Sequence, residues 1–431
     1  MKKVALHTLG CKVNSYETEA MSQLLEKAGF SIVPFSDVAD IYIVNTCSVT
    51  NMADRKSRQM LHKAKKKNPD AIVIAAGCYA QTDTDGARDD VAVDIVVGNN
   101  KKINIVEIIN DYFEKHVSES LIDINKTDEY EALELTEKVE HTRAHIKIQD
   151  GCNNFCAYCI IPYARGRNRS RYMKEIKAEA ERLAEIGYKE IVLTGINLSA
   201  YDDAGQKLID VCEMLNEVDG IERIRISSLD PVIVDEAFAE RLAMCEKICP
   251  HFHLSLQSGC DKILKSMNRH YTANDYYAKC EILRKYFPDV VFTTDIIVGF
   301  PGETEEDYKE CRDFARKVGF AMLHVFKYSR RNGTVAANMP EQVDEQVKSR
   351  RSDDLIQVGE AMREEYLKNQ LGKQKAVLFE EEVEIDGEKY WVGHTKDYIQ
   401  VAVKSDEIIA GGIKDVNLEK IAKNQIILAT L

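Results

Sequence analysis

Three features that would place this 431-residue chain in other protein classes are missing. No apolar run approaches the roughly 20 residues that cross a bilayer, so no membrane-spanning helix is expected. The apolar run after Met1-Lys2-Lys3 ends at His7, which is too early for a secretory signal. The net charge of −13 argues against a non-specific polyanion binder, because phosphate contacts need cationic surface. We expect a cytoplasmic protein without a membrane partner.

Cysteine, by contrast, is abundant, with twelve residues. Thiols stay reduced in the cytoplasm, so clustered cysteines indicate metal ligands before disulfides. Half of these cysteines show no metal-ligand spacing and are expected to be small core residues. They are Cys212, Cys245, Cys249, Cys260, Cys280 and Cys311.

The most informative segment carries Cys152, Cys156 and Cys159 at C-x3-C-x2-C spacing, directly after a predicted strand at residues 145–148. Three thiols in one loop can hold a cubane iron–sulfur cluster and leave its fourth iron without a protein ligand. A small molecule can then chelate that iron. The alternatives are buried thiols, a disulfide or a zinc site, but a zinc site usually has a fourth thiolate or imidazole close by.

The first part of the chain alternates apolar strands with amphipathic helices. Strands are predicted at 3–9, 41–45 and 71–76, and helices at 15–29 and 54–67. Asn14 is expected to cap the first helix, with Glu17 three residues on. Strand–helix alternation of this kind predicts an α/β fold with a doubly wound parallel sheet.

Three further cysteines follow the ends of these strands. Cys11, Cys47 and Cys78 each come one or two residues after a separate strand. The carboxyl ends of parallel strands share one edge of the sheet, which is where open α/β sheets bind ligands. The three thiols should therefore converge and form a second cluster site with an open iron. The alternative is that they are unrelated core cysteines.

The rest of the chain predicts two more folding units. Between residues 145 and 326 six strand–helix units follow one another, which predicts a partial (β/α)6 TIM barrel with its site at the carboxyl ends of the strands. Four short strands after residue 371 predict a small β-barrel. We therefore divide the chain into residues 1–128, 141–370 and 371–431, with a polar, acidic linker at 129–140.

Taken together, the motifs resemble the methylthiotransferases of the radical S-adenosylmethionine (SAM) superfamily over nearly the whole chain. The carboxyl-terminal barrel resembles the family's TRAM domain. Besides the cysteine loop, the matching segments are 8–14, 45–47, 77–81, 161–162, 165–166, 194–197, 227–231, 256–259 and 295–304.

The resemblance implies a transferase that replaces a C–H bond by C–S–CH3. It implies two [4Fe–4S] clusters and two SAM molecules per turnover. The cluster on Cys152, Cys156 and Cys159 would bind SAM and cleave it to methionine and a 5′-deoxyadenosyl radical, which takes hydrogen from carbon 2 of an adenine. The cluster on the other three cysteines, Cys11, Cys47 and Cys78, would carry the sulfur.

Within the family, segments 8–14, 16–19 and 51–58 resemble the branch that acts on threonylcarbamoyladenosine at position 37 of tRNA, next to the anticodon. The alternatives are isopentenyladenosine in tRNA or an aspartate of a ribosomal protein. A rival of another class is a non-catalytic iron–sulfur redox protein. The threonylcarbamoyl group ends in a carboxylate, which arginine can meet with two parallel hydrogen bonds. We therefore expect Arg165, Arg330 and Arg331 to contact substrate.

The resemblance also implies further contacts and partners. SAM or the substrate would meet residues at strand ends and in the cysteine loop. These are Tyr158, Gly195, Ser228, Gln257, Asp295, Gly299 and Pro301. The expected partners of a monomeric enzyme are the tRNA anticodon stem-loop, a single-electron reductant such as flavodoxin or ferredoxin, and a sulfur donor.

Overall fold

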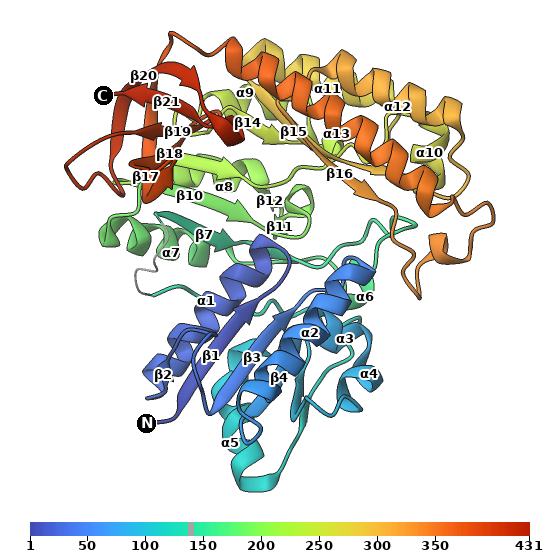
Figure 1. The fold of residues 1–431 in the computed structure, drawn as a ribbon, viewed down its shortest axis with the longest axis vertical. Coiled ribbons are helices and arrows are strands. Elements are labelled where there is room, and N and C mark those ends of the chain that lie inside the picture. The colour runs from blue at the N-terminus through green and yellow to red at the C-terminus, as the bar shows by residue number, and fades with distance from the viewer. Residues whose placement is uncertain (137–141) are drawn as a thin grey trace.

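A six-stranded parallel sheet forms the amino-terminal part of the molecule (Figure 1). The computed structural model describes residues 1–136 and 142–431. The sheet has the order β2-β1-β3-β4-β5-β6. Its strands are β1 (Lys3–Thr8), β2 (Ser31–Ile32), β3 (Ile41–Thr46), β4 (Ile72–Gly77), β5 (Ile95–Val97) and β6 (Glu119–Ser120). The helices are α1 (Lys12–Lys27), α2 (Asn51–Lys67), α3 (Cys78–Thr82), α4 (Thr84–Arg88) and α5 (Ile105–Lys115).

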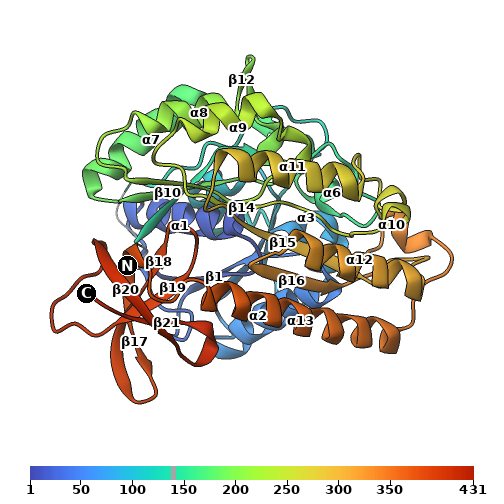
Figure 2. The same cartoon turned by 90° about the horizontal axis from the view of Figure 1, so that it is seen from above.

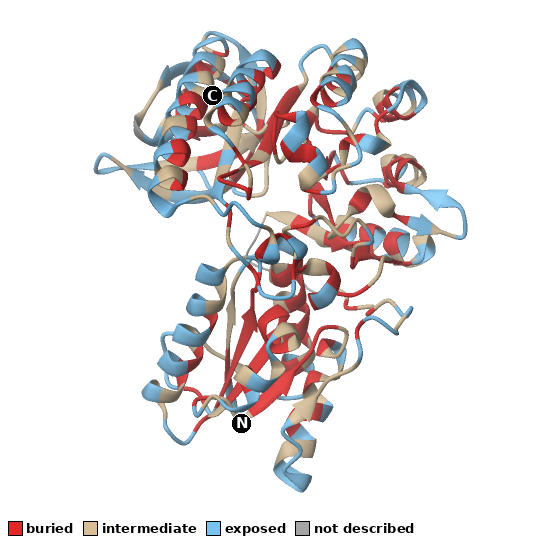
Figure 3. Ribbon diagram, turned by 90° about the vertical axis from the view of Figure 1, so that its right-hand side faces the viewer, coloured by how far each residue is buried: buried red, intermediate tan, exposed pale blue. Residues whose placement is uncertain are grey.

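Helices cover both faces of this sheet, as predicted. Strand β3 is buried along its whole length, which is typical of a parallel strand with two covered faces. Met21 and Leu25 of α1 pack on one face together with α5, and Leu61 of α2 packs on the other. Figure 3 shows the strands buried and the outer sides of the helices exposed. The doubly wound sheet is confirmed.

Helices α1 and α2 both begin three residues earlier than predicted, α2 at Asn51 and not at residue 54. Helix α1 begins at Lys12 with Cys11 at its N-cap, three residues earlier than expected. Asn14 is therefore inside the helix and caps nothing. Its amide instead donates to the carbonyl oxygens of Leu9 and Thr46, at 2.7 and 2.9 Å. Tertiary hydrogen bonds to two strand ends outweigh the local preference of asparagine for a cap.

Six parallel strands form the predicted partial barrel. They run as β7 (Arg143–Lys147), β10 (Glu190–Thr194), β13 (Arg223–Ile226), β14 (His251–His253), β15 (Val291–Val298) and β16 (Met322–Lys327). Their order is β7-β10-β13 and β14-β15-β16, and the bridges Ile224–Ile248 and Leu229–Leu254 join the two halves.

Helices lie on the outer side of these strands (Figure 2). They are α7 (Met173–Ile186), α8 (Leu208–Asn216), α9 (Glu236–Ala243), α10 (Asp261–Ser266), α11 (Ala273–Tyr286), α12 (Glu305–Val318) and α13 (Glu345–Lys368). All six cysteines that were predicted to be core residues are buried.

The carboxyl-terminal part is a closed five-stranded barrel, in the order β17-β18-β19-β21-β20. Its strands are β17 (Gln374–Ile385), β18 (Glu388–Thr395), β19 (Gln400–Val403), β20 (Ile413–Ile421) and β21 (Ile427–Thr430). The sequence did not predict β20, because charged residues interrupt it. Only Val416 and Leu418 of that strand are buried, and they pack into the barrel core. We keep residues 1–128, 141–370 and 371–431 as the proposed division of the chain.

Shorter elements complete the chain. They are β8 (Gln149–Asp150), β9 (Arg169–Ser170), β11 (Asp202–Asp203), β12 (Gln206–Lys207), α6 (Ile161–Ala164) and 3-10 turns at Lys102–Asn104, Leu198–Ala200, Pro231–Ile233, Val335–Asn338 and Lys423–Gln425. Within the described residues, no helix combines the length and the apolar character that crossing a bilayer requires.

The segment predicted as a polar linker packs against the sheet domain where the structure describes it. Leu133 and Leu135 are buried against Tyr16 and Ala20 of α1. Glu134 pairs with Arg171 at 2.9 Å. Glu131 is also buried and accepts a hydrogen bond from the backbone N–H of Ile103 at 2.8 Å, whereas Glu129 is exposed. Residues 137–140 of this segment lie outside the described part.

A buried ionic cluster joins the sheet domain to the partial barrel. Glu17 of α1 pairs with Lys147 of β7 and with Arg165, both at 2.8 Å, and also with Lys102. Asp150 pairs with Lys147 at 2.7 Å and with Arg165 at 3.1 Å. All five side chains are at most 3% exposed. Burial alone would raise the pKa of Glu17, but the charges of Arg165, Lys102 and Lys147 outweigh it and hold that pKa well below its usual range.

Replacing Glu17 by Gln should destabilise the protein by about 3–5 kcal/mol, because it leaves three buried cations with one carboxylate. Denaturant unfolding measures the loss. Glu26→Gln, on the exposed side of the same helix, is the matched control and should change little. The pKa of Glu17 is lower in the folded than in the unfolded protein. The contribution of Glu17 to the free energy of unfolding is therefore complete above about pH 4.3 and is lost as the pH falls below that value. Equal stability of the two variants would contradict this role.

Candidate functional site

Cys11, Cys47 and Cys78 come together at one edge of the amino-terminal sheet. They follow β1, β3 and β4, which are neighbours in the sheet, so the three strand ends lie side by side. Gly10 has a φ of +99°, and a Cβ atom there would lie 2.7 Å from the Cys47 sulfur. Glycine at this position therefore lets the loop after β1 approach the loop after β3.

Hydrogen bonds fix these loops to one another. The Asn14 amide bridges the carbonyls at the ends of β1 and β3. The Thr46 hydroxyl donates to the carbonyl of Ala76 on β4 and accepts from the backbone N–H of Tyr79 at 3.1 Å. The three thiols are thus carried on backbone whose positions are set by the sheet.

The second triad, Cys152, Cys156 and Cys159, lies on the loop after β7 and β8. The backbone N–H of Cys152 donates to the Gly166 carbonyl at 3.1 Å, and that of Cys159 to the Cys156 carbonyl at 2.9 Å. Gly151 has a φ of +70°, and a Cβ there would lie 1.9 Å from the carbonyl oxygen of Arg167. Only glycine fits at the start of this loop.

Four N–H donors reach sulfur atoms of the two triads. They are Asn99 on Cys78 at 3.6 Å, the Asn154 backbone on Cys152 at 3.5 Å, Asn197 on Cys152 at 3.7 Å, and Arg269 on Cys156 at 3.4 Å. All six thiols are free of disulfides. Donors of this kind support cluster-bound thiolates. Sequence reasoning missed Asn99 and Arg269, because each belongs to a segment remote from its cysteine and has no motif of its own.

Burial raises the pKa of Cys47 to about 11 and that of Cys159 to about 12. A thiol in such surroundings stays protonated at neutral pH, so it is a poor nucleophile on its own. Binding of a metal displaces the proton. The thiols therefore fit iron ligands better than catalytic nucleophiles.

A cavity of about 230 Å³ lies between the barrel mouth and the sheet domain. Tyr158, Cys159 and Gln257 line it from the barrel, and Val49 and Thr50, which follow Cys47 closely, line it from the sheet domain. The cavity thus touches Cys159 of the second triad and the segment that follows Cys47, although no cysteine of the sheet-edge triad lines it.

The predicted cofactor contacts divide into two groups. Tyr158, Gln257 and Asp295 line this cavity. Four others are not among the residues that line it: Gly195, Ser228, Gly299 and Pro301. A Cβ on Gly299 would lie 2.3 Å from Cγ of Lys348, so its φ of +72° serves packing against α13. The expected approach of the Gly299 backbone to an adenine is not supported by its placement.

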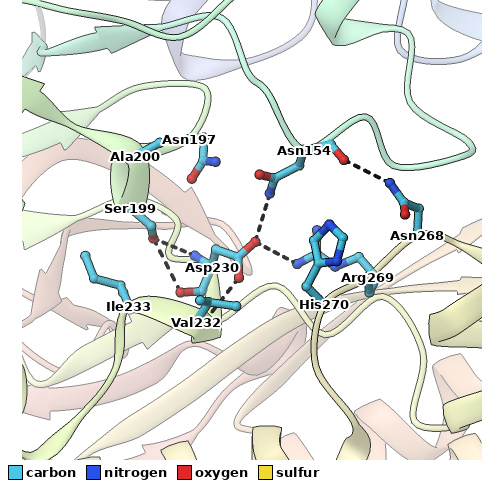
Figure 4. A pocket seen from close by; sticks show the side chains of 10 residues that line it. All are labelled: Asn154, Asn197, Ser199, Ala200, Asp230, Val232, Ile233, Asn268, Arg269 and His270. Carbon is cyan, nitrogen blue, oxygen red and sulfur yellow. Dashed lines mark hydrogen bonds and ion pairs between the residues drawn. The ribbon is translucent and has the colours of Figure 1, made fainter.

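A second cavity, of about 240 Å³, lies on the other side of the cysteine loop (Figure 4). Asp230 is at its centre, where its carboxylate accepts from the Asn154 amide and pairs with Arg269, both at 3.1 Å. Arg269 also donates to Cys156, and Asn197 to Cys152. Three residues that line this cavity, Asn197, Asp230 and Arg269, therefore contact the cysteine loop.

Two of the three arginines expected to bind substrate are occupied elsewhere. Arg165 is fully buried in the ionic cluster. Arg331 is 7% exposed, pairs with Asp54 and donates to Asn51 at 2.7 Å. Both side chains join the sheet domain to the barrel and are paired within the protein, and their direct contact with substrate stays a prediction. Arg330 is exposed, although its Nε donates to the Ala337 carbonyl.

The chain is similar to known proteins over nearly its whole length. Residues 146–315 match the Radical SAM superfamily, and residues 3–98 match Uncharacterized protein family UPF0004. Threonylcarbamoyladenosine tRNA methylthiotransferase MtaB of Bacillus subtilis is 42% identical over 426 residues, which cover 97% of this chain and 94% of the relative. The protein of the same name from Aquifex aeolicus is 38% identical over 390 residues, which cover 90% and 95%.

The chain is also similar to a tRNA-modifying relative of another name and, at low identity, to a solved structure. The tRNA-2-methylthio-N(6)-dimethylallyladenosine synthase of Alkaliphilus oremlandii is 37% identical over 426 residues, which cover 97% of this chain and 90% of the relative. The solved structure of the radical S-adenosylmethionine methyltransferase TsrM from Kitasatospora setae has a TM-score of 0.58 and 16% identity, and it covers 76% of this chain and 73% of its own. That likeness shows the fold alone.

Replacing Gly10 by Ala should lower the iron content of reconstituted protein by about four atoms per chain, the content of one cubane, because the new Cβ collides with Cys47. Gly29→Ala is the matched control. Gly29 has a similar φ of +87° but nothing within 4 Å of its Cβ position, so it tests backbone strain alone. Iron and sulfide analysis measures the effect, and an equal loss in both variants would show that the clash is irrelevant.

Proposed function

Since the chain belongs to the methylthiotransferase family of radical SAM enzymes, we propose that it converts threonylcarbamoyladenosine in tRNA to its 2-methylthio derivative. The observation that carries the proposal is the cavity between the barrel and the sheet domain, which is lined by Cys159 and by Val49 and Thr50 of the segment that follows Cys47. The relatives from Bacillus subtilis and Aquifex aeolicus, whose names state this substrate, support the choice of branch.

The radical SAM domain implies a [4Fe–4S] cluster and SAM. We assign this cluster to Cys152, Cys156 and Cys159, and a second one to the sheet-edge cysteines, Cys11 and Cys47 with Cys78. Free thiols with N–H donors on their sulfur atoms support both assignments. When bound, the clusters and two SAM molecules per turnover would pass on one electron from an external reductant and supply the radical that takes hydrogen from carbon 2 of adenine, the sulfur and the methyl group.

The task of the protein is to hold the two cysteine sites at a fixed separation around the reactant. On one side of the cavity, the backbone N–H of Asn51 donates to the Ser329 hydroxyl at 3.1 Å, and the Asn51 amide donates to the Arg330 carbonyl at 3.0 Å. Arg331 adds its ion pair with Asp54. We call this set of contacts the α2 clamp. Positioning of this kind is worth several orders of magnitude in rate.

The residues that line the cavity suit a planar reactant. Tyr158 and Phe326 supply apolar rings, and Gln257 and Asp295 supply polar edges. Such a lining orients an adenine and limits the water around it, which protects a reactive intermediate. We further propose a cytoplasmic monomer whose partners are the tRNA anticodon stem-loop, a single-electron reductant such as flavodoxin or ferredoxin, and a sulfur donor.

A second candidate is the dimethylallyladenosine branch, because the relative from Alkaliphilus oremlandii that bears this name is 37% identical over nearly the whole chain. Nucleoside mass spectrometry of tRNA from cells with and without this protein distinguishes the two. We expect loss of the 2-methylthio derivative of threonylcarbamoyladenosine and accumulation of its precursor. Unchanged levels of both would refute the proposal, and loss of the isopentenyl derivative would favour the second candidate.

Replacing Cys11, Cys47 and Cys78 together by Ala should abolish methylthio product while SAM cleavage continues, because the other triad stays intact. Release of methionine and 5′-deoxyadenosine after anaerobic reduction measures the first function, and the methylthio nucleoside measures the second. Cys280→Ala, at a buried core position, is the control and should keep both activities. Methylthio product from the triple variant would exclude a sulfur-carrying role for these cysteines.

A further inference from the structure

Helix α2 carries charge of almost one sign. Between Asn51 and Lys67 it has seven Lys and Arg residues and a single acidic residue, Asp54, whose carboxylate pairs with Arg331. The molecule as a whole is acidic, with a net charge of −13. Helix α2 is therefore a local concentration of positive charge in a chain whose other parts have an excess of carboxylates.

Contacts divide these cations into two sets. Lys65 pairs with Asp94 at 2.8 Å, and Lys67 donates to the Ser36 carbonyl, so both tie the end of the helix to neighbouring loops. The second set is exposed and makes no ion pair or hydrogen bond with any residue that the structure describes. We call this set the basic stripe, and it consists of Arg55, Lys56, Lys63 and Lys66.

The basic stripe lies on one side of α2. The opposite side is buried against the sheet through Leu61 and Ala64. At 3.6 residues per turn the four cations fall within about 100° of one another around the helix axis, and at 1.5 Å per residue they extend over about 16 Å. A surface of this length and sign can follow several consecutive phosphates of one RNA strand.

The stability of the helix does not account for the basic stripe. Cations in the last turn interact favourably with the helix dipole, which explains Lys66. Arg55 and Lys56 lie near the amino-terminal end, where a positive charge gains nothing from the dipole. Exposed cations elsewhere are paired along their helix, as Lys115 of α5 is with Asp111 at 2.7 Å. The basic stripe has no such pairs, so its charge is available to an anion from outside the chain.

The helix begins at the mouth of the cavity between the barrel and the sheet domain. Thr50, which caps α2, lines that cavity. Val49 and Phe326 also line it and are 51% and 46% exposed, and Met52 in the first turn of α2 is 56% exposed. From there α2 runs along the sheet domain, away from the barrel (Figure 1). Apolar side chains for bases beside cations for phosphates are typical of surfaces that bind single-stranded nucleic acid.

The carboxyl-terminal barrel, by contrast, is acidic. Residues 371–431 contain 8 Lys and Arg residues against 11 Asp and Glu residues. Phosphate contacts need local cationic surface, so α2 suits an RNA backbone better than this barrel does.

We propose that Arg55, Lys56, Lys63 and Lys66 bind phosphates of the tRNA strand that leads to the reactive nucleotide, so that α2 holds the anticodon stem-loop while the base enters the cavity. The inference rests on the proposed function, since it names how that substrate is held. Contacts with phosphates carry no sequence information. The basic stripe therefore sets affinity and position, whereas the cavity selects the base.

The test measures the binding of two anticodon stem-loop RNAs, with and without threonylcarbamoyladenosine, to the full-length, reconstituted protein at several salt concentrations. Replacing Arg55, Lys63 and Lys66 together by Gln should weaken the binding of both RNAs by about 10- to 100-fold. The slope of log K against log salt concentration should become shallower by about 2, because each lost phosphate contact removes about 0.7. The charge-conserving variant, with Arg55→Lys, Lys63→Arg and Lys66→Arg, should keep the original slope.

The matched control removes three exposed cations from another helix, by replacing Lys309, Arg316 and Lys317 of α12 with Gln. This helix lies on the outer side of the partial barrel, so the salt slope should not change. Iron content equal to that of the unaltered protein shows that a variant retains its fold. Lys63→Gln alone, which should make the slope shallower by about 0.7, replaces the triple variant if that variant loses iron.

The outcomes separate the basic stripe from the proposed function. An unchanged salt slope in the Gln variant of α2, or the same change in the α12 control, would overturn the phosphate contacts. Weaker binding of the modified RNA alone would also overturn them, because both RNAs have the same phosphates. Methylthio product from a protein whose α2 variant keeps its slope would refute the basic stripe alone. RNA binding that depends on α2, without methylthio product, would refute the proposed function while the basic stripe stands.

Discussion

The ion pairs between Glu17, Arg165 and Asp150 are the interaction on which the active-site geometry depends. Glu17 belongs to the helix that follows Cys11, and Arg165 and Asp150 belong to the segments that frame the cysteine loop. Because all three are buried, separating the domains would leave charges without partners, which is far more costly than losing surface pairs. The relative position of the two cysteine triads is therefore set by one desolvated network.

A second set of contacts acts on the other side of the cavity. The α2 clamp ties the start of α2 to the loop after β16, so the sheet domain is held to the barrel at two separate places. The proposed reaction uses both cysteine sites, so it needs a fixed separation between them. Arg165 and Arg331, which the sequence suggested as substrate ligands, both take part in these contacts.

Most of the buried positive charge of this acidic protein is paired with carboxylates. The molecule is acidic overall, with a net charge of −13, yet several cations near the cavity are neutralised in buried pairs. Lys102, Lys147 and Arg165 all pair with Glu17, and Lys147 and Arg165 also pair with Asp150.

The sequence alone determined the three fold units, because strand–helix alternation and the short strands after residue 371 are local patterns. It also predicted that Cys11, Cys47 and Cys78 follow neighbouring strands, since strand ends are visible in one dimension, and the sheet order agrees. It missed strand β20 and the true start of α1, where charge and an asparagine obscure the pattern. Tertiary structure alone decided which arginines are paired. Arg331 pairs with Asp54, which lies 277 residues earlier in the chain, and no local pattern records such a contact.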